Sequence, residues 1–379
     1  MLGLYIHIPF CIKKCNYCNF VSVPAKENAQ QVDAYIDALV KEIELTGNMY
    51  EKTVDSIFIG GGTPSLLDVK QLNKIMTALQ KYYKIFGNCE ITLESNPCSL
   101  DIKKLKAYRE MGINRLSIGL QAAQDEHLAA LGRQHTVQGF DTAFSNARKA
   151  GFENINVDMI YALPNQTMKE LAQTVQHILS KKPEHISAYA LKIEKGTPFY
   201  RLLQDEKIVQ VDEDTDVEMY HKVQEMLCEC GYTNYEISNF AYTDCECRHN
   251  LKYWNLKDYL GLGIAAHSCI DRLRFANTSD MSEYLENMRT GELNYPIFDF
   301  ISDSNRKIEY IMLKLRLKKG FTFYDYQNKF HEDFLETHEE EMKKVLEYDL
   351  AKVVDASLMP TAKGFDLQNQ LVAILIDKM

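Results

Sequence analysis

Short apolar segments alternate with amphipathic segments through the first half of this 379-residue chain, and this alternation constrains its fold most strongly. The apolar segments are rich in Ile, Val, Leu and Phe and show little of the two-residue alternation of a half-exposed strand. They cover residues 4–8, 56–59, 90–93, 115–119, 154–159 and 185–191. Strands of this composition are covered on both faces, so the pattern predicts a parallel sheet.

Helical patterns occupy the stretches between these segments. In residues 36–43 and 72–79 the apolar side chains recur at the i, i+3, i+4, i+7 spacing of a helix with one buried face. Strand and helix in alternation predict an α/β fold, either an open parallel sheet or an incomplete (β/α)6 TIM-like barrel. In both architectures ligands bind at the carboxyl ends of the strands, so functional residues should follow each strand directly.

The second half of the chain predicts two further parts. Residues 201–300 combine a helix near 217–228 with an extended piece at 235–240, and we expect them to extend the barrel formed by residues 1–200. Residues 301–379 predict a small α+β domain, in which helices near 305–317 and 338–347 precede a short β-like end.

Charge and hydropathy exclude several classes of protein. Lys and Arg number 43 against 53 Asp and Glu, and a net charge of −10 argues against a nucleic-acid partner. No segment reaches the roughly 18 apolar residues of a membrane span. The apolar N-terminus lacks the basic region and cleavage site of a signal peptide. We therefore expect a cytoplasmic protein with reduced thiols.

Three of the ten cysteines, Cys11, Cys15 and Cys18, form a C-x3-C-x2-C cluster. Thiolates this close repel one another unless a metal holds them. Three thiolates do not complete a tetrahedral zinc site, and the spacing is not that of zinc fingers. A [4Fe–4S] cluster normally takes four cysteines, so three leave one iron open to a small molecule. The spacing resembles the signature of radical S-adenosylmethionine (SAM) proteins.

Polar and glycine residues follow the predicted strands, where a barrel would place a ligand. Such a set suits a zwitterionic ligand with a ribose, because carboxylates can accept from hydroxyls and a guanidinium can hold a carboxylate. Glycines allow the backbone to approach the ligand closely. The residues in question are Gly61, Gly62, Thr63, Glu94, Gln121, Arg133 and Asp158.

Several longer motifs resemble the oxygen-independent coproporphyrinogen III oxidase family. They are YIHIPFC-x3-C-x2-CNF, GGGTPS, ESNP, RLSIGLQ, LGRQHT and VDMIYALPNQT, in family order from Tyr5 to about Phe199. The resemblance implies a radical SAM (β/α)6 partial barrel, a winged-helix-like C-terminal domain, and a [4Fe–4S] cluster on the three clustered cysteines. It also implies that SAM is lined by Tyr5, Gly61, Gly62, Thr63, Glu94, Gln121, Arg133, Asp158 and Ile160.

Two departures from the oxidase resemble the haem-chaperone branch of that family. Phe20 stands where the oxidase has a fourth cysteine, and the first strand begins at once, without the longer N-terminal segment of the oxidase. Phe20 argues against coproporphyrinogen decarboxylation.

His249 begins the sequence HNLKYW, which resembles the HNxxYW motif whose histidine ligates haem iron in the chaperones. Imidazole is a common axial ligand of haem, and Tyr253 and Trp254 offer flat apolar faces to a macrocycle. The alternative is a structural histidine beside a core aromatic pair. Zinc on Cys245, Cys247 and His249 is disfavoured by the spacing, and the C-x-x-C-H signal for covalent haem attachment is absent. His267 lies in a second family-like stretch, GLGIAAHS, or is a core histidine.

Two functional hypotheses follow. The first is a haem chaperone that binds haem and passes it to an acceptor, often a membrane-bound respiratory enzyme. The second is a radical SAM enzyme of porphyrin metabolism that generates a 5′-deoxyadenosyl radical, so the sequence leaves enzymatic activity open. In the C-terminal domain, Glu336 and the acidic run 339–341 favour a lid or partner surface over DNA binding.

Overall fold

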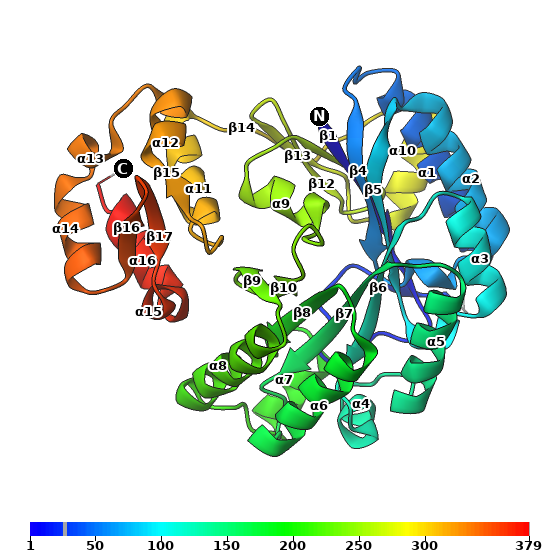
Figure 1. The fold of residues 1–379 in the computed structure, drawn as a ribbon. Helices are drawn as coiled ribbons and strands as arrows, with labels where there is room; N and C mark the ends of the chain where they lie inside the picture. The colour runs from blue at the N-terminus through cyan, green and yellow to red at the C-terminus, as the bar shows by residue number, and fades with distance from the viewer. Residues whose placement is uncertain (26–28, 379) are drawn as a thin grey trace.

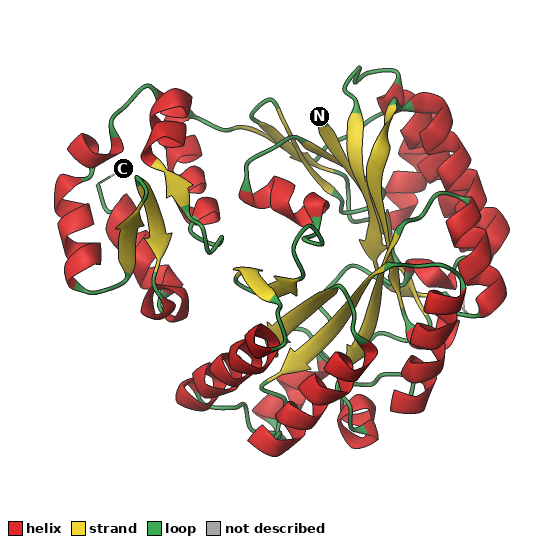
Figure 2. Ribbon diagram, in the orientation of Figure 1, coloured by secondary structure: helices red, strands yellow, loops and turns green. Residues whose placement is uncertain are grey.

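The computed structural model describes residues 1–25 and 29–378 and shows an α/β fold built on one curved sheet (Figures 1 and 2). Within these residues, seven neighbouring strands of the sheet run parallel. In sheet order they are β11 (Tyr259–Leu262), β1 (Leu2–Ile8), β4 (Val54–Gly61), β5 (Ile85–Ser95), β6 (Arg115–Gln121), β7 (Asn154–Tyr161) and β8 (His185–Ala190). The predicted partial barrel and its six strands are confirmed, and β11 adds a strand that the sequence did not predict.

Helices cover the outer face of this sheet (Figure 2). They are α1 (Ala29–Gly47), α2 (Val69–Tyr82), α3 (Ile102–Glu110), α4 (Asp125–Ala130), α5 (Val137–Lys149), α6 (Met168–Lys181) and α7 (Pro198–Gln204). Two of them begin at a capping box, in which Asp68 pairs with Gln71 and Thr167 pairs with Glu170. These side chains satisfy amide groups that the first helical turn leaves free, so the start of each helix is encoded locally.

The two faces of the sheet differ in chemistry. Leu116 and Ile118 of β6 are fully buried in the main hydrophobic core, which joins the strands to the outer helices. Ser117 alternates with them and bonds to Asn156 on the neighbouring strand β7. Asn156 in turn bonds to His185 on β8. The inside of the partial barrel is therefore polar, with side chains that bond from strand to strand.

Residues 201–300 extend the sheet at both edges. After α8 (Glu213–Glu229), strands β9 (Thr233–Glu236) and β10 (Asn239–Ala241) continue it antiparallel beyond β8. Beyond β11 lie β12 (His267–Ile270), β13 (Leu273–Ala276) and β14 (Ile297–Phe300), also antiparallel. The helices α9 (Arg248–Trp254) and α10 (Met281–Thr290) come from the same region, and α9 lies on the inner side of the sheet (Figure 1).

The last part of the chain packs around its own hydrophobic core. It contains the sheet β15–β17–β16, formed by Phe321–Thr322, Ser357–Pro360 and Ala351–Val354, with helices α11 (Asp303–Lys314), α12 (Phe323–Phe330), α13 (Phe334–Thr337) and α14 (Glu339–Glu347). This mixture agrees with the α+β prediction, and the winged-helix-like character stays a prediction. This last part of the chain contacts the barrel through two backbone hydrogen bonds. Ile237 N donates to Arg316 O at 3.1 Å, and Lys318 N donates to Tyr235 O at 3.1 Å.

The β-like segment predicted after the helix at 338–347 is confirmed by β16 and β17, but the chain does not end with it, because two helices follow β17. They are α15 (Ala362–Asp366) and α16 (Gln368–Ile376). The side chain of Thr361 accepts from Gly364 N and caps α15, and Leu371 and Leu375 bury one side of α16. A short apolar run at a chain end has too few residues for its period to separate strand from helix. None of the helices in the described residues is long and apolar enough to cross a membrane.

Candidate functional site

A cavity of about 580 Å³ opens at the carboxyl ends of the parallel strands. This is where ligands bind in barrels and open α/β sheets. The sequence-predicted residues that line it are Cys11, Cys15, Cys18, Gly61, Gly62, Thr63, Glu94, Gln121, Arg133, Asp158 and Ile160. The structure therefore brings residues from six separate segments of the chain to one cavity.

Three free thiols lie along one side of this cavity. Cys11 ends β2 (Phe10–Cys11), which pairs with β3 (Val23–Pro24) and fixes the start of the cysteine loop. Thr63 Oγ1 lies 3.6 Å from Cys11 Sγ, and Arg133 Nη1 lies 3.8 Å from Cys15 Sγ. Burial raises the pKa of Cys11 and of Cys18. Phe20, 68% exposed, also lines the cavity.

The donor set fits an iron–sulfur cluster better than a single ion. Among the described residues, no three His, Cys, Asp or Glu side chains are close enough to hold one metal ion. A [4Fe–4S] cube separates its thiolate ligands more widely than a single ion does, and three thiolates would leave one iron open.

The glycines at the end of β4 and just after it bring the backbone against the cavity wall. Gly61 N donates to Glu94 Oε2 at 3.1 Å, and Gly61 has a φ of +109°, in the region that favours glycine. A Cβ on Gly62 would lie 2.7 Å from the backbone oxygen of Phe10. Burial raises the pKa of Glu94 to about 8, with a further contribution from the negative charge of Asp158. Glu94 is thus a carboxyl group poised between its neutral and charged forms.

Two further polar side chains line the same cavity from the next two strands, β6 and β7. Gln121 ends β6 with a φ of +73°, a conformation that costs a non-glycine residue about 1–3 kcal/mol and is common at binding sites. Asp158 accepts from Ser117 at 2.9 Å and from Asn156 at 2.7 Å, which fixes its carboxylate.

Arg133 is held at the cavity by the backbone of β6. Its Nη2 donates to Gly119 O at 2.9 Å, whereas its buried Nε has no hydrogen-bond partner among the described residues. A buried guanidinium with an unused donor fits an anionic group such as the carboxylate of SAM.

Tyr5 is the predicted cofactor residue that does not line the cavity. Its hydroxyl lies 3.0 Å from His7 Nδ1, and its ring stacks on Phe58 with centroids 6.3 Å apart. Tyr189, which the sequence analysis did not select, does line the cavity and is 43% exposed. It is separated by two and four residues from Ser187 and His185 on β8, so the strand period could have pointed to it.

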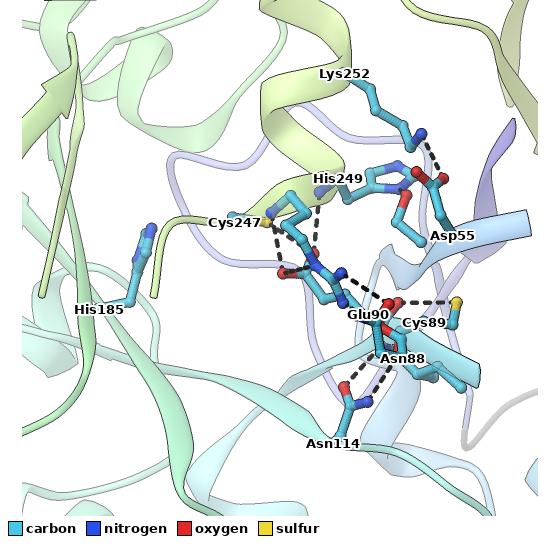
Figure 3. Close-up of polar contacts among 12 residues, drawn as sticks. Asp55, Asn88, Cys89, Glu90, Asn114, His185, Cys247, His249 and Lys252 are labelled. Carbon is cyan, nitrogen blue, oxygen red and sulfur yellow. Dashed lines mark hydrogen bonds and ion pairs between the residues drawn. The ribbon is translucent and has the colours of Figure 1, made fainter. Parts of the chain in front are cut away.

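His249 lies elsewhere, at the opposite end of the strands, in the group of polar residues shown in Figure 3. Its Nδ1 is 3.0 Å from Ser56 Oγ, and its Nε2 is 2.9 Å from the hydroxyl of Tyr253. The side chain is 1% exposed. Burial lowers its pKa to about 3, and the positive charges of Lys252 and Arg115 act in the same direction.

The two predicted sites are separated by the length of the barrel. Ser56 lies near the start of β4 and Gly61 ends it. Five residues of strand span about 16 Å at roughly 3.3 Å per residue. His267, at the start of β12, is exposed and belongs to neither site.

Comparison with known proteins agrees with this architecture. Residues 5–178 match the model of the radical SAM superfamily. The chain is 34% identical to heme chaperone HemW of Buchnera aphidicola (Schizaphis graminum), covering 99% of this chain and 98% of that protein. It is 33% identical to heme chaperone HemW of Bacillus subtilis, covering 100% of both chains. The chain belongs to the HemW family.

A solved structure supports the fold of this HemW-family chain. This chain superposes on the structure of coproporphyrinogen III oxidase (HemN) from Escherichia coli with a TM-score of 0.86 and 22% identity, and the match covers 100% of this chain and 90% of the other. At this identity the match establishes the shared fold, including the last 80 or so residues, roughly a domain's length. The radical SAM barrel predicted from the sequence is confirmed.

Proposed function

We propose that this protein is a haem chaperone, which binds haem and passes it to an acceptor protein. The observation that carries the proposal is its similarity, over nearly the whole chain, to proteins named heme chaperone HemW. The exposed Phe20 supports it, because this side chain stands at the cavity where the decarboxylating oxidase resembled by the sequence has a cysteine. The acceptor we infer is a haem-requiring protein, with membrane-bound respiratory enzymes as the first candidates.

The cavity residues have defined tasks in this proposal. Cys11, Cys15 and Cys18 would hold a [4Fe–4S] cluster, and Arg133 would bind the carboxylate of an exchangeable SAM. Glu94 and Asp158 would accept from the ribose hydroxyls. When bound, the cluster and SAM together supply one-electron chemistry. The protein supplies the cavity that orients them and limits access of water.

The haem ligand we propose is His249. An imidazole is a strong axial ligand of haem iron, and this one is neutral because burial and nearby positive charge lower its pKa. Both ring nitrogens are engaged with Ser56 and Tyr253, so ligation requires the ring to leave these partners. We place the protein in the cytoplasm, because a C-x3-C-x2-C cluster that holds metal needs reduced thiols, and thiols are kept reduced there.

A second candidate function is a radical SAM enzyme of porphyrin metabolism. It is favoured by one observation, the convergence of the complete thiol, glycine, arginine and carboxylate set on one cavity. An enzyme of this class would cleave SAM in the presence of its substrate.

An anaerobic haemin titration of the cluster-loaded protein tests the proposal. The chaperone hypothesis predicts a saturable Soret shift near one haem per chain, altered in His249→Ala while the cluster absorbance stays unchanged. Absence of specific haem binding, together with SAM cleavage when coproporphyrinogen III is added, would instead support the enzyme.

A further inference from the structure

The start of α9 rests on a buried carboxylate from another part of the chain. Glu90 of β5 is 5% exposed. It accepts from Arg248 N and from His249 N, each at 3.0 Å (Figure 3). The thiol of Cys247 lies 3.6 Å from the same carboxylate. Cys247 itself provides no side-chain cap for the helix, so Glu90 satisfies the first amides of α9 from across the barrel.

Further contacts fix α9 in the same position. Lys252 Nζ lies 2.5 Å from Asp55 Oδ1, and the Lys252 side chain is 8% exposed. The ring of His249 packs on Phe58, with centroids 5.4 Å apart. These contacts act on one face of α9 and attach it to β4 and β5, so the helix closes over the base of the barrel.

This arrangement is incompatible with an iron ligand at His249. The ring is buried and neither nitrogen is free, whereas haem iron must reach a nitrogen along its lone pair with a flat macrocycle beside it. Movement of α9 away from the barrel would uncover His249, and two groups of contacts oppose it: the charge-assisted hydrogen bonds of its first amides to Glu90 and the Lys252–Asp55 ion pair.

We propose that Glu90 is a positioning residue for haem binding: it holds α9 in a closed position that covers His249, and haem binds after α9 leaves Glu90. This inference rests on the proposed function, in which His249 is the haem ligand. A protein whose binding-competent form is a minor population binds with an affinity reduced by that fraction. Weakening the closed form must therefore strengthen haem binding, the opposite of what loss of a ligand does.

The chain contains a built-in reporter for this movement. Trp254, its one tryptophan, lies on α9. In the closed position the Arg316 guanidinium lies 4.9 Å from the centre of its ring, and its indole nitrogen is buried. Release of α9 should expose the indole to water and shift its emission to longer wavelength.

The test compares Glu90→Gln with the wild type, both cluster-loaded and full length, with haemin as the probe. Gln keeps the size of the side chain and removes its charge. We expect red-shifted Trp254 emission and an apparent haem Kd lowered about tenfold, with faster association. Ser56→Ala and Lys252→Met weaken the closed position at other contacts and should act in the same direction, which keeps the test valid if Glu90→Gln does not fold.

Glu42→Gln is the matched control. Glu42 is a fully buried carboxylate on α1 that accepts from Gly263 N at 2.8 Å and from the Tyr284 hydroxyl at 2.7 Å, and none of its bonds reaches α9. This variant should lower stability while leaving haem affinity and Trp254 emission unchanged.

Each outcome bears on one claim. Tighter haem binding in Glu90→Gln that disappears in Glu90→Gln/His249→Ala supports the proposal. Shifted emission with unchanged or weaker haem binding overturns it, as does emission that stays unchanged in all three variants. If His249→Ala keeps the haem spectrum of the wild type, the ligand assignment in the proposed function fails, independently of Glu90.

Discussion

Lowering the pH should reduce the unfolding free energy of the protein through His249, by an amount that follows from the surroundings of this side chain. In the folded protein the pKa of His249 falls from its ordinary value of 6.5 to about 3, because the ring is buried beside the charges of Lys252 and Arg115. On lowering the pH, the unfolded chain therefore takes up a proton before the folded protein does. The stabilisation is fully present above about pH 6.5 and is lost progressively as the pH falls toward 3.

The expected magnitude follows from these two pKa values. A pKa difference of one between the folded and unfolded states corresponds to about 1.4 kcal/mol. A pH of 5 lies about 1.5 below the pKa of the histidine in the unfolded chain. Lowering the pH from 7 to 5 should thus cost about 2 kcal/mol of unfolding free energy through His249 alone. That is a large fraction of a typical domain stability of about 5–15 kcal/mol.

The assay is urea unfolding of the apo-protein under reducing conditions at pH 7 and pH 5, followed by Trp254 fluorescence. His249→Gln serves as the comparison, because it removes the titrating group and other groups contribute equally to both proteins. The wild type should lose about 2 kcal/mol more than the variant between the two pH values. Equal losses in the two proteins would refute the argument that His249 is buried as a neutral ring.

Three further predictions concern other parts of the chain. Alanine at any of the three cavity cysteines should abolish the visible absorbance after anaerobic reconstitution, and intact iron and sulfide content would contradict the cluster assignment. Arg133→Ala should weaken SAM binding at least about tenfold in equilibrium dialysis with the cluster retained, and unchanged affinity would show that Arg133 does not contact SAM. Gly364→Ala should lower stability by at least about 2 kcal/mol in thermal unfolding, since a Cβ there would lie 1.7 Å from Leu350 O; a wild-type Tm would contradict this.

The barrel could be predicted from the sequence because its information is local. Strands such as 115–119 and 154–159 are continuous apolar runs. Because ligands bind at the carboxyl ends of parallel strands in a barrel, Glu94 and Gln121, which follow or end their strands, are expected at one cavity, and both line it. β11 escaped prediction because Tyr259–Leu262 is only four residues long and contains a glycine. It is stabilised as a strand by pairing with β1, far away in the sequence.

The surroundings of His249 could not be predicted from the sequence, because they too depend on contacts between segments far apart in the chain. Glu90 begins a predicted strand segment, and nothing in its neighbourhood of the sequence indicates that it will accept from amides more than 150 residues later. The sequence allowed His249 to be a haem ligand or a buried structural histidine. The structure shows the buried arrangement, and the ligand role is the proposal that depends on movement of α9.

In the proposed function, haem and SAM bind at opposite ends of one barrel, since Ser56 beside His249 and Gly61 at the cavity lie about 16 Å apart along β4. The most direct test is the Kd of SAM for the cluster-loaded protein, measured by equilibrium dialysis with and without saturating haemin. Separate sites predict that both ligands bind together and that the SAM Kd changes by less than about twofold. Displacement of SAM by haem would contradict the account, because it would place haem in the cysteine cavity.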